Sequence, residues 1–294
     1  MISKDRMKRT SWSARLCARA GLSYHVIDSE WKMFYLMPYE AQELIAQSRG
    51  LKTIVTFSSR HYNSLRLLRQ TLNGLGTLDA IGLNLVVGNP AYLTEREIRR
   101  PSIRTLVDSI RFVRRYFKDL TVFIGAEGLI SKAAQLSVEY DLIPFLLLDR
   151  GLEDDLATVR DFVRKSEIAL YAPFLISENY PRLLHDILFR LSGYIMRRSW
   201  VRGELKKLGY DLTASTLKAV IQDKKPLPTK LMRSNLGIFL KKAASSLTLY
   251  GNMKEVTERI NHIRMQGVTT VIGLPIKENE QQILSFGKCV SKSI

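Results

Sequence analysis

The most informative stretch of this sequence is Val122-Phe123-Ile124-Gly125-Ala126-Glu127-Gly128. It is an apolar run that ends in Gly-x-x-Gly and passes directly into a helical pattern over residues 129–136. A strand that turns at once into a helix leaves free backbone N–H groups at the helix start, where the positive end of the helix dipole suits a phosphate. Glycine also serves ordinary tight turns, and the local sequence alone favours that structural interpretation. The stretch therefore predicts a strand-to-helix unit and leaves phosphate binding open.

The same unit recurs along most of the chain. Short runs rich in β-branched residues alternate with helical patterns, and they are continuously apolar, as is typical of strands covered on both faces. The series predicts an α/β protein, either a (β/α)8 barrel or a doubly wound open sheet. In both folds ligand sites lie at the carboxyl ends of the strands. The predicted strands are 24–27, 53–56, 81–87, 121–124, 142–148, 168–175 and 268–272.

Composition narrows the function classes. The two cysteines, Cys17 and Cys289, belong to no CxxC pair, and the four histidines have no zinc-ligand spacing. We therefore expect no metal site and a reducing, cytoplasmic location. No apolar run approaches the roughly 18–20 residues that span a bilayer, so we expect no membrane partner. The chain is interpreted as a single domain over residues 1–294, with a flexible start at 1–12 and a long helical region at 181–244.

The net charge of +17, from 45 Lys and Arg against 28 Asp and Glu, favours an anionic partner. Nucleic acid, a membrane surface and a phosphorylated or polycarboxylate cofactor all fit this charge. The basic residues are dispersed and accompany no nucleic-acid-binding motif, so a solvated surface is the favoured interpretation and nucleic acid is disfavoured as a partner. Short basic clusters occur at 96–104, 111–118, 197–207 and 224–242.

Small and polar residues dominate the predicted strand ends. They favour a pocket lined by backbone for a flat cofactor, and neither a Ser-His-Asp order nor a carboxylate pair stands out. Asp28 and Glu30 are the best candidates for an acid or base, although a helix cap explains them about equally well. The residues at these ends are Asp28, Ser29, Glu30; Phe57, Ser58, Ser59, Arg60; Gly88, Asn89; Gly125 to Gly128; Asp149, Arg150; Ser177, Glu178, Asn179; Gly273 and Pro275.

Four segments carry a resemblance to a known family. They read ARLCARAGL at 14–22, GNP at 88–90 followed by RP at 100–101, FIGAEG at 123–128, and GNMKEV, GVTTV and GLP in turn between 251 and 275. In this combination the chain resembles the bacterial luciferase-like flavin and deazaflavin oxidoreductases. It looks most like the archaeal-type coenzyme F420-dependent methylenetetrahydromethanopterin reductases.

The resemblance implies a luciferase-like (β/α)8 TIM barrel whose helical insertion before the last strand falls at 181–244. It implies that Gly125, Ala126, Glu127 and Gly128 hold the phosphate of coenzyme F420 or FMN. Thr56, Phe57, Ser58 and Ser59 match a strand bulge that supports the ring from behind, and Gly88 with Asn89 would line the floor. The basic rim slightly favours coenzyme F420, which bears a phosphate and a glutamate tail.

The chain also departs from the family pattern. The family's first strand is lacking or truncated, because the segment that would hold it, residues 1–10, is short and charged. Asp28-Ser29-Glu30 replaces an Asp-His pair, Phe57 stands where the reductases have glycine, and Glu127 places a carboxylate beside the expected phosphate.

Three functions follow. The first is an F420- or flavin-dependent oxidoreductase that transfers hydride to a small or pterin-like substrate, as a monomer or homodimer. The second is a divergent, non-catalytic barrel that has lost its cofactor. The third, which rests on charge alone, is a basic nucleic-acid-binding protein.

Overall fold

A computed structural model describes residues 4–28, 51–58, 62, 64–74, 80–87, 103–125, 127–163, 167–222, 224–277 and 279–293. The helix predicted at 39–48 lies outside these residues. In the described part no helix is long and apolar enough to cross a bilayer. The elements, in chain order, are α1 (Lys4–Arg19), β1 (Tyr24–Asp28), β2 (Lys52–Phe57), α4 (Leu65–Gly74), β3 (Ile81–Leu85), α6 (Ile103–Tyr116), β4 (Thr121–Gly125), α7 (Ile130–Tyr140), β5 (Ile143–Leu147), α8 (Leu152–Phe162), β6 (Ala169–Ile176), α9 (Tyr180–Arg190), α10 (Ser192–Arg197), α11 (Ser199–Lys207), α12 (Ala214–Ile221), α13 (Thr229–Arg233), α14 (Asn235–Leu247), β7 (Leu249–Gly251), α15 (Met253–Met265), β8 (Thr270–Pro275) and α16 (Glu280–Lys292).

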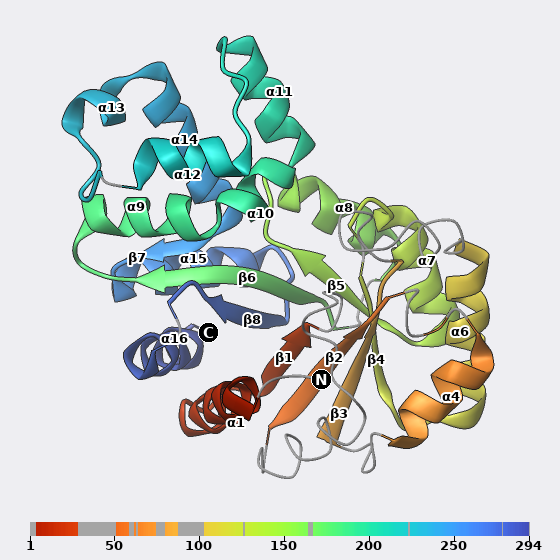
Figure 1. The fold of residues 1–294 in the computed structure, drawn as a ribbon. Coiled ribbons are helices and arrows are strands. Elements are labelled where there is room, and N and C mark those ends of the chain that lie inside the picture. Colours follow the sequence, from red (N-terminus) through yellow and green to blue (C-terminus); the bar gives the residue numbers. More distant parts are fainter. Residues whose placement is uncertain are drawn as a thin grey trace. The chain divides into compact units, whose positions relative to one another are not determined.

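The strands and helices alternate, so the predicted α/β fold is confirmed (Figure 1). The strands pair in the order β1-β2-β3-β4-β5-β6-β7, and β8 pairs with β6. Every neighbouring pair for which a register is given is parallel. All seven predicted strand regions contain strands. The additional strand β7 was not predicted, because it has only three residues and lies between two helical patterns.

Two compact units make up the chain. Unit 1 comprises Met1–Leu147, Asp154–Leu170 and Gly267–Ile272. Unit 2 comprises Leu148–Glu153, Tyr171–Gln266 and Gly273–Ile294. The division cuts through β6 and β8, whose first residues belong to unit 1 and whose last residues belong to unit 2.

The sheet of unit 1 is curved so that one face is concave. The rings of Tyr24 on β1 and Phe123 on β4 lie with their centroids 5.8 Å apart. On a flat sheet, strands three positions apart would be separated by about 14 Å. Phe123 also makes an edge-on contact with Phe145 of β5, so this face carries an aromatic core.

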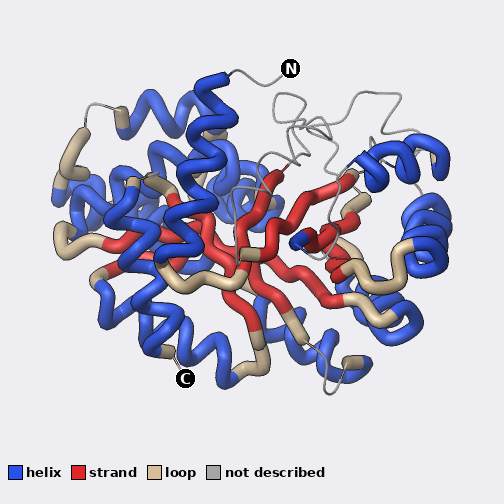
Figure 2. Tube along the Cα trace, turned by 90° about the horizontal axis from the view of Figure 1, so that it is seen from below, coloured by secondary structure: helices blue, strands red, loops and turns tan. Residues whose placement is uncertain are grey.

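Alternate residues of the same strands point the opposite way, since side chains alternate along a strand. Val55, Leu83 and Val122 share one row on this second face and are 2% exposed or less. Helices α4, α6 and α7 lie beside these strands (Figure 1), and the tube view shows helices flanking the strands (Figure 2). Burial on both faces explains why these strands are continuously apolar in sequence.

The starts of β1 and β8 are joined by side chains rather than by a backbone ladder. The Glu167 carboxylate accepts hydrogen bonds from Tyr24 Oη at 3.5 Å and from Thr270 Oγ1 at 2.6 Å. The described strands show no pairing between β1 and β8, and no described strand precedes α1. The described part of unit 1 is therefore an open parallel sheet, in keeping with a (β/α)8 pattern that lacks its first strand.

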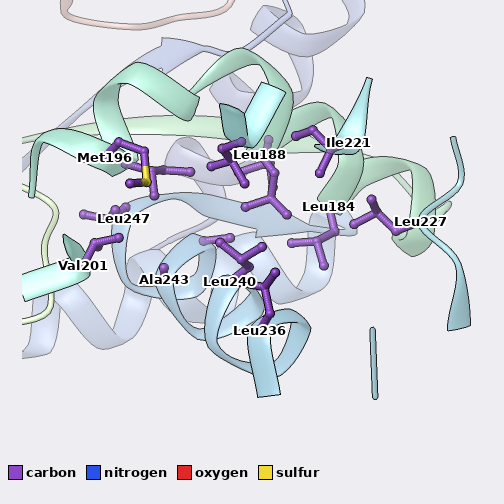
Figure 3. Close-up of a cluster of buried hydrophobic side chains, with 14 of the residues drawn as sticks. Leu184, Leu188, Met196, Val201, Ile221, Leu227, Leu236, Leu240, Ala243 and Leu247 are labelled. Carbon is purple, nitrogen blue, oxygen red and sulfur yellow. The ribbon is translucent and has the colours of Figure 1, made fainter. Parts of the chain in front are cut away.

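Unit 2 is built around a helical core. Helices α9 to α14 fill the region that was predicted to be helical at 181–244. Leu184, Leu188, Val201, Leu240 and Ala243 come from three of these helices and point into one buried cluster (Figure 3). The central helix α9 has six consecutive buried residues, 183–188, because other helices cover it on more than one side. Asn179 caps the start of this helix by accepting a hydrogen bond from the Arg182 N–H.

Candidate functional site

The carboxyl ends of β1 to β4 in unit 1 bring several predicted site residues into one row. The register pairs Asp28 with Thr56, Thr56 with Asn84, and Asn84 with Phe123. Residues that pair in a parallel sheet point to the same face. Thr56 and Asn84 therefore lie on the concave face, together with Phe123. Of Asp28 only the backbone position, at the end of β1, is described.

Asn84 is a buried polar residue of this row with an incomplete set of hydrogen bonds. Its Nδ2 donates to Thr56 Oγ1 at 3.3 Å, and the residue is only 3% exposed. Its Oδ1 is buried and has no hydrogen-bond partner. The assignment of O and N in an amide follows from its partners, and either assignment leaves one polar atom of Asn84 unsatisfied. A buried polar atom without a partner costs about 1–3 kcal/mol, which a ligand can relieve.

Gly125 lies beside this amide, and the Val86 side chain packs against the glycine. A Cβ atom at position 125 would lie 3.7 Å from Asn84 Oδ1 and 2.4 Å from Val86 Cγ1. Only glycine avoids the second contact without a shift of Val86. The sequence predicted Gly125 as a backbone group of a ligand site, and the structure places it next to the unsatisfied amide of Asn84.

The loop after Gly125 leads to the start of α7. Glu127 and Gly128 are exposed, and Gly128 has a φ of 71°, a conformation that favours glycine. No side chain caps α7, and its first turn carries no acidic residue. An uncapped helix start offers backbone N–H groups to an anion. The exposure of Glu127 weakens its repulsion of an anion, because water and salt screen exposed charges.

Phe57 and Ser58 follow Thr56 but are placed differently. Phe57 pairs with Leu85, and Leu85 pairs with Ile124, so Phe57 points to the helix-covered face and away from Asn84. Thr56 and Phe57 pair one to one with β3, so the strand bulge implied by the family resemblance is absent from this described part. The side chain of Phe57 therefore does not fill the concave face. Ser58 is fully buried directly after the strand.

Several predicted site residues lie outside the described part of the chain. They are Glu30, Ser59, Gly88, Asn89 and Ala126. In the part that is described, no group of three or more His, Cys, Asp or Glu residues could hold a metal ion.

Two titratable groups of β1, His25 and Tyr24, have shifted pKa values, and neither adds an acid or base to this row. His25 is buried on β1, and desolvation lowers its pKa to about 4, so the imidazole is neutral at pH 7. His25 pairs with Thr53 and therefore points to the face opposite Asn84. Burial, followed by the nearby Glu167 carboxylate, raises the pKa of Tyr24 to about 12.

A separate groove of about 580 Å³ lies between α4 and α6. It is lined by aromatic and basic side chains, including Tyr62, Phe112, Arg111 and Arg115, and by no predicted site residue. Tyr62 Oη donates to the Val86 carbonyl at 2.5 Å, which fixes the end of β3.

Asn84 was not among the predicted site residues. The available signal was a single amide within the apolar run over 81–87, since a polar residue in a strand buried on both faces needs a partner. The sequence did not show whether the structure would supply that partner.

The chain belongs to a family of unknown function, DUF7388, whose model matches residues 75–282. It is 23% identical over 269 residues to the uncharacterized protein MJ1239 of Methanocaldococcus jannaschii, covering 91% of this chain and 88% of that protein. The crystal structure of apo-MsnO8 has a similar fold, with a TM-score of 0.60 at 11% identity over 100% of this chain and 95% of that chain. The holo form of the aldo-keto reductase AKR11C1 from Bacillus halodurans reaches a TM-score of only 0.47 at 11% identity, over 95% and 80% of the two chains.

Proposed function

We propose that the carboxyl end of the unit 1 sheet binds a planar, phosphate-bearing cofactor, coenzyme F420 or FMN. On this proposal the protein is a luciferase-like oxidoreductase that transfers hydride to a small or pterin-like substrate. The observation that carries the proposal is the buried, unsatisfied amide of Asn84 at the carboxyl end of the strands, next to Gly125. The ring edges of flavins and deazaflavins carry amide-like N–H and C=O groups, which match either atom of this amide.

The fit of the phosphate rests on helix α7. Its uncapped start follows Gly125 by five residues and has no acid in its first turn. A phosphate there would accept hydrogen bonds from backbone N–H groups and gain from the helix dipole. The partly exposed Lys132 side chain adds a positive charge to the same first turn. This arrangement supports Gly125, Ala126, Glu127 and Gly128 as the phosphate loop.

When bound, either cofactor supplies the hydride chemistry itself. The chain's own residues bind and orient it. Asn84 fixes the ring edge, Thr56 holds the Asn84 amide in place through the 3.3 Å hydrogen bond, and the aromatic core around Phe123 excludes water from the floor. Asp28 and Glu30 remain the candidates for an acid or base because they follow the end of β1.

The test is an equilibrium titration of the purified protein with coenzyme F420 and, separately, with FMN, followed by cofactor fluorescence. We expect dissociation constants in the micromolar range for one of the two. Asn84→Leu should weaken that binding at least tenfold, because the ligand then leaves a polar group unpaired. Asn235→Leu, which changes an exposed asparagine of α14, is the matched control and should bind as the wild type does.

Failure of both cofactors to bind at 100 μM would overturn the proposal and favour the second function, a divergent barrel without cofactor chemistry. Equal weakening by Asn84→Leu and Asn235→Leu would also contradict it, since the site would then not involve the buried amide.

A further inference from the structure

Unit 2 carries most of the excess positive charge. Residues 180–247, which form α9 to α14, contain 14 Lys and Arg but only four Asp and Glu. One of these acids, Asp186, is buried and is neutralised by Lys225 and Lys277. Twelve of the 14 basic residues are exposed. The sequence had made these charges look dispersed, and their placement in the fold shows where they gather.

The packing of α11 against α14 brings basic residues from three separate segments together. Val201 and Leu205 of α11 share the buried cluster with Leu240 and Ala243 of α14 (Figure 3). The neighbouring residues on each helix are left at the surface. On α11 they include Trp200, Glu204 and Lys207, and on α14 they include Phe239 and Lys242.

Glu204 of α11 lies at this surface and forms an ion pair with Lys207. Hydrogen bonding and charge from Lys207, at 2.9 Å, lower the pKa of its carboxyl, and the positive charges of Arg150 and Lys242 act in the same direction. Lys207 is in contact with Glu204, and Lys242, three residues after Phe239 on α14, lies on the side of that helix that meets Trp200. We call Arg150, Trp200, Glu204, Lys207 and Lys242 the basic patch.

Trp200 gives the basic patch an aromatic element. Its ring lies under the Arg150 guanidinium, 5.6 Å from the ring centroid, and its Nε1 donates to Asp149 at 2.8 Å. The edge contact with Phe239, with centroids 6.2 Å apart, fixes the ring on the other side. The indole is thus held rigidly while part of it stays exposed.

We propose that the basic patch of unit 2 binds single-stranded nucleic acid. Proteins that bind single strands combine cations along the phosphate backbone with aromatic rings on which bases stack. A membrane-binding surface would instead bury aliphatic side chains. Ile238, at 58% the most exposed aliphatic residue of α11 to α14, lies one turn before Lys242, so the vesicle measurement below separates a membrane from nucleic acid. This inference is independent of the proposed cofactor site in unit 1.

The test is fluorescence anisotropy of a labelled 20-nucleotide poly(dT) or poly(rU) strand, titrated with the full chain between 50 and 300 mM KCl. Each phosphate contact on a single strand contributes about −0.7 to the slope of log K against log salt. Lys207→Glu with Lys242→Glu should therefore make the slope shallower by about 1.4 and weaken binding at least tenfold at 100 mM KCl. The pair Lys254→Glu with Lys288→Glu changes the net charge equally at exposed positions of α15 and α16 and should stay within threefold of the wild type.

The neutral pair Lys207→Gln with Lys242→Gln repeats the measurement with less disturbance of the fold, and circular dichroism checks each variant. A weakening that is equal in the patch and control pairs would overturn the proposal, because bulk charge would then explain the binding. No binding of either strand by the wild type at 50 mM KCl would overturn it as well, including when vesicles rich in phosphatidylserine do bind.

Discussion

Two buried amide side chains, one in each unit, differ in whether their hydrogen bonds are satisfied. Gln282 of unit 2 donates from Nε2 to the Ile176 carbonyl at 2.6 Å and accepts from the Ile176 N–H at 2.8 Å. Asn84 of unit 1 makes one hydrogen bond and leaves its other amide atom unsatisfied. Asn84 is a residue of β3 and Gln282 a residue of α16, and both are less than 10% exposed.

We assign the two amides different roles on the basis of this difference. Gln282 makes hydrogen bonds to both the N–H and the C=O of Ile176, the last residue of β6. These bonds satisfy buried backbone groups, so the role of Gln282 is structural. The buried Asn84 amide has one polar atom without a hydrogen bond, which lowers the stability of the fold, and no described neighbour supplies that bond. We infer that Asn84 is kept for a ligand, and the following variants test this contrast.

The largest loss of stability should come from Gln282→Leu. The variant leaves both the N–H and the C=O of Ile176 buried without partners, which costs about 2–5 kcal/mol in total. Urea unfolding followed by circular dichroism measures this loss. Gln281→Leu, at an exposed position one residue earlier, is the control and should change stability by less than about 0.5 kcal/mol. Equal losses in the two variants would show that Gln282 has no special role.

The second expected effect is a pH dependence of stability caused by the buried carboxylate of Asp186. Burial raises the pKa of its carboxyl, but hydrogen bonds from Lys277 and Lys225 and their charges outweigh burial, and the net pKa lies below its ordinary value. The carboxylate therefore stabilises the fold above its unfolded pKa of about 3.9, and this contribution is lost as the pH falls through the lower folded pKa.

Asp186→Asn should accordingly lower the stability at pH 7 by about 2 kcal/mol, because it leaves two lysines without their counter-ion. Urea midpoints between pH 7 and pH 3 would show a smaller acid-induced decrease in the variant than in the wild type. Parallel pH curves for the two proteins would contradict this role.

Gly125→Ala should have a smaller effect on stability and a clear effect on binding. Its new Cβ would meet Val86 Cγ1 at 2.4 Å, and overpacking of this kind costs about 1–3 kcal/mol. The shift of Val86 that this contact forces lies next to Asn84 Oδ1, which is 3.7 Å from the new Cβ, so cofactor affinity should decrease. Gly151→Ala, whose Cβ meets no atom within 4 Å, is the matched control. A Gly125→Ala protein with unchanged affinity would place the ligand elsewhere.

The sequence predicted much of the fold because the strands are apolar runs of the right length. The three-residue strand β7 escaped prediction, since so short a segment has no measurable periodicity. The site was predicted less completely. Gly125 could be identified from its Gly-x-x-Gly context, whereas the direction of Phe57 depends on the register with Leu85, and only the register shows that it faces away.

The basic patch could not be predicted for a related reason. Arg150, Lys207 and Lys242 come from three segments that are distant in sequence, and only helix packing brings them to Glu204. The unsatisfied state of Asn84 likewise depends on what surrounds it in the fold. Contacts between segments that are distant in sequence depend on the fold, and a single sequence does not show them.

The central claim is that Asn84 is kept for binding at some cost to stability, and one measurement tests it most directly. It compares the urea unfolding free energy of the wild type and of Asn84→Leu, each with and without a saturating concentration of the cofactor that binds. We predict that Asn84→Leu without cofactor is as stable as the wild type or about 1 kcal/mol more stable, because an unsatisfied polar atom has been removed. We also predict that cofactor stabilises only the wild type. A variant that is destabilised by more than about 2 kcal/mol, and that cofactor stabilises as much as it does the wild type, would show that Asn84 is a structural residue.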